Sequence, residues 1–147
     1  MSLPQPDPVF LSRARKGTVY AVGLGLWLSG VLWLVYHYFK QQKTDFGPTP
    51  HPLEHWWLAL HGLFAFASLW VLGMLWSAHI VGAWRTKRHR VSGGVVLGVL
   101  LILIASGYLL YYLGSDEALS TVALVHWAIG VALPAPFLWH RLVKNRK

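Results

Sequence analysis

The chain contains no cysteine among its 147 residues. Disulfides, iron–sulfur clusters, thiolate metal sites and covalent attachment of a c-type haem are therefore excluded. Charge is also scarce, since only 12% of the residues are charged and only five of these are acidic. Histidine, present eight times, is then the only strong ligand that the chain offers to a soft metal.

Apolar residues fill the space that charges leave. They make up 55% of the chain, nine residues are tryptophan, and the mean hydropathy is +0.45, values outside the range of ordinary soluble domains. Four uncharged segments are each long enough to cross a bilayer, which takes ~20 residues. The first begins too late, and is followed by too many others, to be a cleaved signal peptide. The four predicted spans cover residues 17–39, 55–84, 91–115 and 118–140.

The basic residues are sorted by loop. Eleven of the thirteen lie before the first span, between the second and third, or after the fourth, and four of the five acidic residues lie in the other two loops. This asymmetry predicts that both termini are cytoplasmic and that loops 40–54 and 114–117 are outside a bacterial inner membrane. Nucleic-acid binding is not expected. We expect an all-α, up-down-up-down four-helix bundle at residues 17–143, in contact with the lipid bilayer, behind a mobile cytoplasmic lead at 1–16.

Two spans carry paired histidines. His61 and His79 are eighteen residues apart, a whole number of turns at ~100° per residue. His126 and His140 are fourteen residues apart, about 40° short of four turns. Spans two and four run in the same direction and face each other across such a bundle, which predicts an outer pair, His61 with His126, and an inner pair, His79 with His140. The inner pair fits less well, because the two rises differ by about 6 Å.

Haem iron takes two axial ligands, so two histidines per site suffice without further ligands. Zinc would need more ligands than these segments supply, and a proton relay would usually include acidic residues, which the spans lack. We therefore expect two b haems. The alternative for each histidine is a hydrogen bond to a neighbouring helix, and it has most weight for His79 and His140, which lie near the membrane surface.

Four further histidines lie outside these pairs. His37 is either an interfacial side chain, a contact to a haem propionate or a quinone, or a ligand. His51 and His55 flank Glu54 in an outer loop whose prolines and glycine predict no regular structure, and a surface metal site there is conceivable. His89 belongs to the basic cytoplasmic loop, and the sequence assigns it no role.

Several short motifs resemble those of small bacterial four-span cytochromes of the cytochrome b561-like class. They are Leu-His-Gly at 60–62, Lys-Arg-His-Arg-Val-Ser-Gly at 87–93, Ser-Gly-Tyr-Leu-Leu-Tyr-Tyr at 106–112 and His-Trp-Ala-Ile-Gly at 126–130. The histidine pairs on the second and fourth helices are also similar to the dihaem core of cytochrome b in quinol:cytochrome c oxidoreductases. The sequence departs from the b561 pattern because span one has no histidine at its cytoplasmic end, so the inner site requires His79 in that role.

The resemblance implies a dihaem cytochrome b that carries electrons across the inner membrane. The donor would be a quinol or a partner subunit, and the acceptor a periplasmic cytochrome or a larger redox complex of the respiratory chain. No nucleotide or flavin motif is present, so we expect an electron-transfer subunit or relay instead of a self-contained enzyme. Two alternatives stay open: a non-haem structural or assembly subunit of a respiratory or photosynthetic complex, and a quinone-reactive subunit with a single haem.

Overall fold

The computed structural model describes residues 11–87 and 89–143. The chain divides into two compact units, here called the first unit, Met1–Gly82, and the second unit, Ala83–Lys147. Within the described residues, four helical segments are long and apolar enough to cross a membrane, which confirms the four predicted spans at the level of length and composition. These segments are Arg13–Phe39, Pro52–Leu75, Arg90–Tyr112 and Asp116–Leu142.

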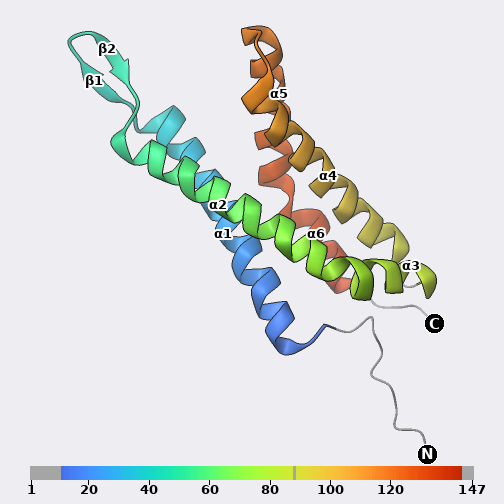
Figure 1. Cartoon of the computed structure of the whole chain (residues 1–147). Helices are drawn as coiled ribbons and strands as arrows, with labels where there is room; N and C mark the ends of the chain where they lie inside the picture. Colours follow the sequence, from blue (N-terminus) through green and yellow to red (C-terminus); the bar gives the residue numbers. More distant parts are fainter. Residues whose placement is uncertain (1–10, 88, 144–147) are drawn as a thin grey trace, which may run out of the picture. The chain divides into compact units, whose positions relative to one another are not determined.

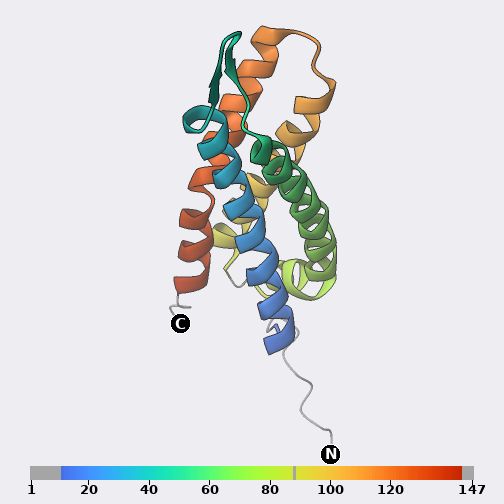
Figure 2. The ribbon, with the colours of Figure 1, turned by 90° about the vertical axis from the view of Figure 1, so that its left-hand side faces the viewer.

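The first unit is an antiparallel pair of helices, α1 (Arg13–Phe39) and α2 (Pro52–Leu75), which lie side by side in both views (Figure 1, Figure 2). α1 begins after Ser12, whose side-chain oxygen accepts a hydrogen bond from the backbone N–H of Arg15 at 3.3 Å. α2 begins with proline at its first position, and the ring of His51 accepts from the N–H of Leu53 at 3.1 Å. Both starts satisfy backbone donors that a helix end leaves unpaired.

A β-hairpin connects these two helices, so the expectation of an irregular loop is wrong. β1 (Gln42–Thr44) pairs with β2 (Gly47–Thr49) in antiparallel register. Gly47 has a φ of 107°, a conformation open to glycine because it has no Cβ. Thr44 reinforces the turn by donating its hydroxyl hydrogen to the Gly47 carbonyl at 2.8 Å. The proline of β2 is tolerated because an edge strand leaves one side of its backbone unpaired.

The second predicted span is not one continuous α-helix. After α2 the chain forms a π-helical turn, η1 (Trp76–Val81), and then a short helix, α3 (Gly82–Arg85). His79 lies within η1. A π-helix holds more residues per turn than an α-helix, so the eighteen-residue spacing from His61 no longer places His79 on the same stripe. The assumption of regular helix geometry was wrong here.

The second unit pairs α4 (Arg90–Tyr112) with two successive helices, α5 (Asp116–Ala132) and α6 (Pro134–Leu142). The predicted fourth span is therefore interrupted at Leu133, directly before Pro134. A proline inside a helical run removes a donor and clashes with the preceding turn, which accounts for the break. α4 carries glycines and serines but no proline, and it continues without interruption through the whole unit.

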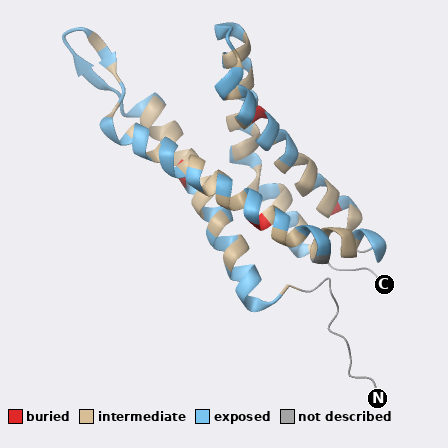
Figure 3. Ribbon diagram, viewed as in Figure 1, coloured by how far each residue is buried: buried red, intermediate tan, exposed pale blue. Residues whose placement is uncertain are grey.

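Buried positions are few in the described residues, as Figure 3 shows. Long apolar side chains such as Phe66 and Trp70 are largely exposed, and in a membrane they would face lipid instead of water. Four described residues are buried: Val71 and three serines, Ser29, Ser92 and Ser106. Burial of polar groups is costly unless they are hydrogen-bonded, so these serines mark the positions at which the helix pairs are specified.

Candidate functional site

His61 of α2 lies against α1 in the first unit. Its Nδ1 is 3.1 Å from the carbonyl oxygen of Leu26 and 3.4 Å from the hydroxyl of Ser29. A carbonyl can only accept a hydrogen bond, so Nδ1 carries the ring proton and Nε2 carries the lone pair. The hydroxyl of Ser29 donates to the carbonyl of Gly25 at 2.7 Å. Its oxygen therefore presents a lone pair to the ring, as this tautomer of His61 requires.

His126 has the same arrangement in the second unit. Its Nδ1 is 2.8 Å from the hydroxyl oxygen of Ser106 on α4. That hydroxyl donates to the carbonyl of Ile102, one turn back on its own helix, at 2.7 Å. Since the serine hydrogen is already used, the serine oxygen accepts from His126 Nδ1–H. The lone pair of this histidine is again on Nε2.

His140 repeats the pattern on the next element of that unit. Its Nδ1 is 3.0 Å from the hydroxyl oxygen of Ser92. The hydroxyl of Ser92 also lies 3.4 Å from the backbone carbonyl of His89, one turn back on the same side of the unit. The ring of His89 stands edge-on to that of His140, with centroids 6.0 Å apart. All three histidines thus contact a serine of the adjacent helix through the same ring nitrogen, Nδ1.

A glycine follows each of these serines, and it lies beneath the histidine ring. A Cβ added at Gly30 would be 2.9 Å from Cε1 of His61. The same addition at Gly107 or Gly93 would be 3.3 Å from Cε1 of His126 or His140. Glycine therefore lets each ring approach the neighbouring backbone closely. We call this arrangement, a Ser–Gly pair on one helix and a histidine of the adjacent helix above it, a Ser–Gly seat.

The two seats of the second unit are in register. Ser92 and Ser106 are fourteen residues apart on α4, and His126 and His140 are fourteen residues apart on the antiparallel elements that pack against it. Equal spacing on both sides brings each histidine to a serine. The break at Leu133 does not disturb this match.

α1 has no Ser–Gly pair at the level of His79. His61 contacts Ser29, and the two helices are antiparallel. A position eighteen residues after His61 therefore faces a position eighteen residues before Ser29, which is residue 11. α1 begins only at Arg13, so it cannot supply a Ser–Gly seat at that level. His61 in the first unit and His126 and His140 in the second therefore occupy the same kind of environment, and α1 offers no equivalent of it to His79.

The other histidines have separate surroundings. His37 Nδ1 is 2.7 Å from Oε1 of Glu54, and its ring stacks on Trp33. His51 caps α2, and the ring of His55 stands edge-on to Trp56. In residues 11–87 and 89–143, no group of three or more His, Asp or Glu side chains could hold a metal ion. The surface metal site considered for the outer loop therefore has no such group in these residues.

Sequence reasoning missed the serines and glycines that hold the histidines. A signal was present, because Ser-Gly occurs at 29–30, 92–93 and 106–107, and the last two are spaced like His126 and His140. Comparisons with protein-family models, with curated proteins and with solved structures give no match.

Proposed function

We propose that the protein is a b-type membrane cytochrome with two haems that carries electrons across the inner membrane as part of a larger redox system. His61 and His126 would ligate the outer haem, and His79 and His140 the inner one. In this proposal the four spans form an up-down-up-down bundle with both termini in the cytoplasm, as the loop charges favour.

The Ser–Gly seats are the observation that supports this proposal best. Haem ligation needs a neutral imidazole with a lone pair on the coordinating nitrogen, and a hydrogen bond from the other nitrogen fixes ring orientation and raises ligand basicity. His61 and His126 meet this requirement through Nδ1, and His140 contacts its serine through the same nitrogen. The donor set therefore fits haem iron with Nε2 as the ligand atom.

A haem held by two histidines would supply one-electron oxidation and reduction without an open iron position, which suits electron transfer better than oxygen chemistry. The chain contributes orientation and an apolar environment. The serines hold the rings, the glycines let them lie close to the neighbouring helix, and the surrounding apolar side chains keep water away from the haem. Donor and acceptor would be a quinol or partner subunit and a periplasmic cytochrome or complex.

A structural subunit, in which histidines only join helices, is the competing function, and the observed interhelical hydrogen bonds favour it too. Such a histidine can bond through either nitrogen, whereas a ligand keeps one nitrogen for the metal and is oriented through the other. The same nitrogen is used in all three seats. This consistency is the reason to prefer haem.

Absorption spectroscopy of the purified chain tests the proposal. We expect a Soret band and, after dithionite reduction, the α band of a b cytochrome, with two haems per chain by pyridine haemochrome. His61→Ala and His126→Ala should each remove one haem. His55→Ala is the matched control, because this exposed histidine of α2 lies outside the seats. A purified, folded protein without a Soret band after haem reconstitution would support the structural function instead.

A further inference from the structure

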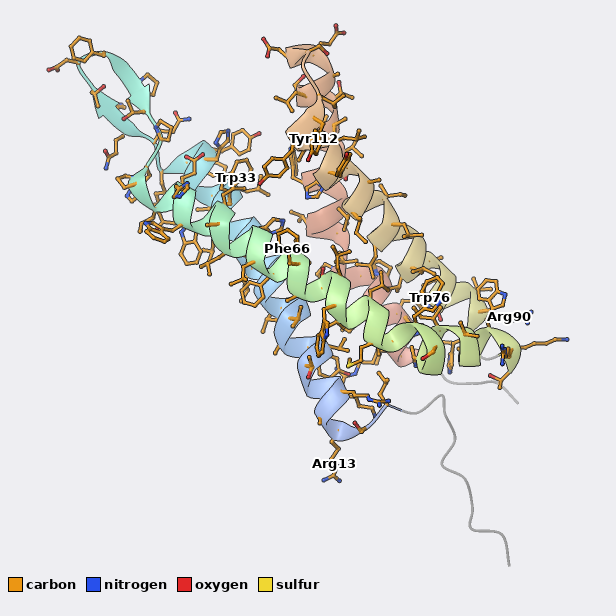
Figure 4. The ribbon with its side chains drawn as sticks, in the orientation of Figure 1. Arg13, Trp33, Phe66, Trp76, Arg90 and Tyr112 are labelled. Atoms are coloured by element: carbon orange, nitrogen blue, oxygen red, sulfur yellow. The ribbon has the colours of Figure 1, made fainter. Side chains whose placement is uncertain are left out.

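The charges of the second unit are sorted between its two ends. Its only acidic residues, Asp116 and Glu117, lie in the first turn of α5. Figure 4 shows Arg90 and Tyr112 at the two ends of α4. The described basic residues lie at the Arg90 end, here called the basic end, and they are Arg85, Lys87, Arg90 and Arg141.

The carboxylates of this unit are too far away to neutralise the basic end. α4 has 23 residues and is therefore about 35 Å long. This length is several times the ~8–10 Å over which physiological salt screens a charge. Within the second unit, the four cations therefore have no acidic side chain as a counter-charge.

The chain reversal between α3 and α4 is closed at Trp84. Nε and a terminal nitrogen of Arg90 both donate to the backbone carbonyl of Trp84, the former at 2.9 Å. The guanidinium carbon lies 5.5 Å from the centre of the Trp84 ring, an attractive cation–π arrangement. Lys87 has a φ of 58°, a left-handed conformation typical of tight turns. The reversal therefore fixes Arg90 and keeps the exposed Arg85 and Lys87 in the same turn.

α6 adds the fourth cation from another element. Nδ1 of His140 is 3.0 Å from the hydroxyl of Ser92 in the first turn of α4, so the last turn of α6 lies next to the start of α4. Arg141 directly follows His140 and is exposed. Two separate elements thus supply positive charge to the basic end.

Exposed apolar side chains accompany these cations and restrict the ligand. Trp84 is 54% exposed, Val91 73% and Leu142 72%. Guanidinium groups bind phosphate oxygens through several N–H donors, and tryptophan is enriched at membrane–water interfaces. A free anion would leave the apolar side chains uncovered. A lipid with a phosphate headgroup would match both the cations and the apolar surface.

We propose that the basic end binds an anionic phospholipid, whose phosphate lies at the cations and whose acyl chains lie along Val91 and Leu142. The site needs no haem, so it goes beyond the proposed function and stands apart from it. It borders the Ser–Gly seat of His140, because Arg141 is the next residue of α6. A lipid that contacts both α4 and α6 would hold the two sides of that seat together.

Native mass spectrometry of the full-length protein in detergent, titrated with phosphatidylglycerol, tests the site. We expect one tightly bound lipid. Phosphatidylcholine with the same acyl chains should bind much more weakly, because its headgroup has no net charge. Arg85→Gln and Lys87→Gln together should weaken phosphatidylglycerol binding about 30-fold, or about fivefold for each charge removed. Arg90 is kept, because its hydrogen bonds close the turn.

The matched control combines Arg13→Gln and Arg15→Gln. It removes the same charge from exposed residues at the start of α1, on the same side of the membrane in the proposed topology. We expect this variant to bind phosphatidylglycerol as tightly as the wild type. Equal losses in the two double variants would show that the lipid responds only to overall charge and would overturn the site. Displacement of phosphatidylglycerol by inorganic phosphate, which has no acyl chains, would overturn it too.

Photocrosslinking with a phosphatidylglycerol that carries a diazirine near its headgroup needs no substitution, in case the double variant does not fold. We expect the label on residues 84–91 and on the last turn of α6. A label confined to other helices, or an equal yield from the corresponding phosphatidylcholine, would contradict the assignment. Neither measurement uses haem absorption, so a protein without haem that passes both tests would keep the lipid site and lose only the cytochrome.

Discussion

The two units differ in the number of Ser–Gly seats that their helices provide. In the second unit, α4 runs without interruption from Arg90 to Tyr112 and carries both seats, so both are set by one regular helix. The break at Leu133 lies on the histidine side and does not matter to their spacing. In the first unit, α1 carries one seat and begins too late to provide a second. A seat is therefore positioned by the uninterrupted helix, not by the helix that bears the histidine.

The π-helical turn, η1, belongs to the first unit. It lies in the part of the first unit that has no Ser–Gly seat, and it contains His79. π-turns are rare and often occur at functional sites, because they change the direction of a side chain without ending the helix. We infer that η1 sets the direction of His79, where a seat sets that of the other three histidines.

The largest effect is expected from removing the inner histidines, one held by a seat and one by η1. His140→Ala and His79→Ala should each reduce the haem content from two per chain to one, since an axial ligand is lost in both. Pyridine haemochrome stoichiometry measures this directly. His51→Ala is a control that removes a histidine outside the proposed ligand set.

Retention of two haems in His79→Ala would contradict the assignment of His79 as a haem ligand. It would mean that the environment lacking a seat is not a ligand site, and that His140 is either unligated or paired with another group. Retention of two haems in His140→Ala would show that a Ser–Gly seat does not identify a haem ligand.

The sequence predicted the features that depend on the average composition of many residues. Twenty or more uncharged residues in a row identify a span whatever their order, and all four were predicted. It was less informative where one residue decides. Pro134 was overlooked although its effect on a helix is known, whereas η1 has no such marker, because a widened turn depends on packing. Ser29, Ser92 and Ser106 look like ordinary small residues until their partners across the helix pair are known.

A smaller effect is expected from replacing the glycines of the seats, and it differs between the two units. Alanine at Gly30 would place Cβ 2.9 Å from Cε1 and 3.0 Å from Nδ1 of His61, so the ring must move. At Gly107 the closest approach is 3.3 Å, to Cε1 of His126. We expect haem affinity to fall by about 10- to 100-fold in Gly30→Ala, as for other changes of groups that contact a metal-ligating histidine, and by less in Gly107→Ala.

Haem retention during dilution or competition with apomyoglobin measures these losses. Gly23→Ala is the control on α1, because nothing lies within 4 Å of the Cβ that it would add. Equal losses in all three variants would show that contact with the histidine ring does not decide the result. A larger loss in Gly107→Ala than in Gly30→Ala would contradict the geometry of the seats.

The smallest effect concerns the serine hydroxyls, and it again separates the units. Ser106→Ala removes a 2.8 Å bond to Nδ1 of His126, whereas Ser29→Ala removes a 3.4 Å contact and leaves the 3.1 Å bond from His61 to a carbonyl. Losing the bond lowers the basicity of the ligand and stabilises ferric haem less, so the midpoint potential should rise, and more in Ser106→Ala. Redox titration of the α band measures the shift. Ser68→Ala is the control, since its hydroxyl donates only within α2. Ser106→Thr, which keeps the acceptor oxygen, should return the potential towards the wild-type value, and a helix-packing role alone would give no such recovery.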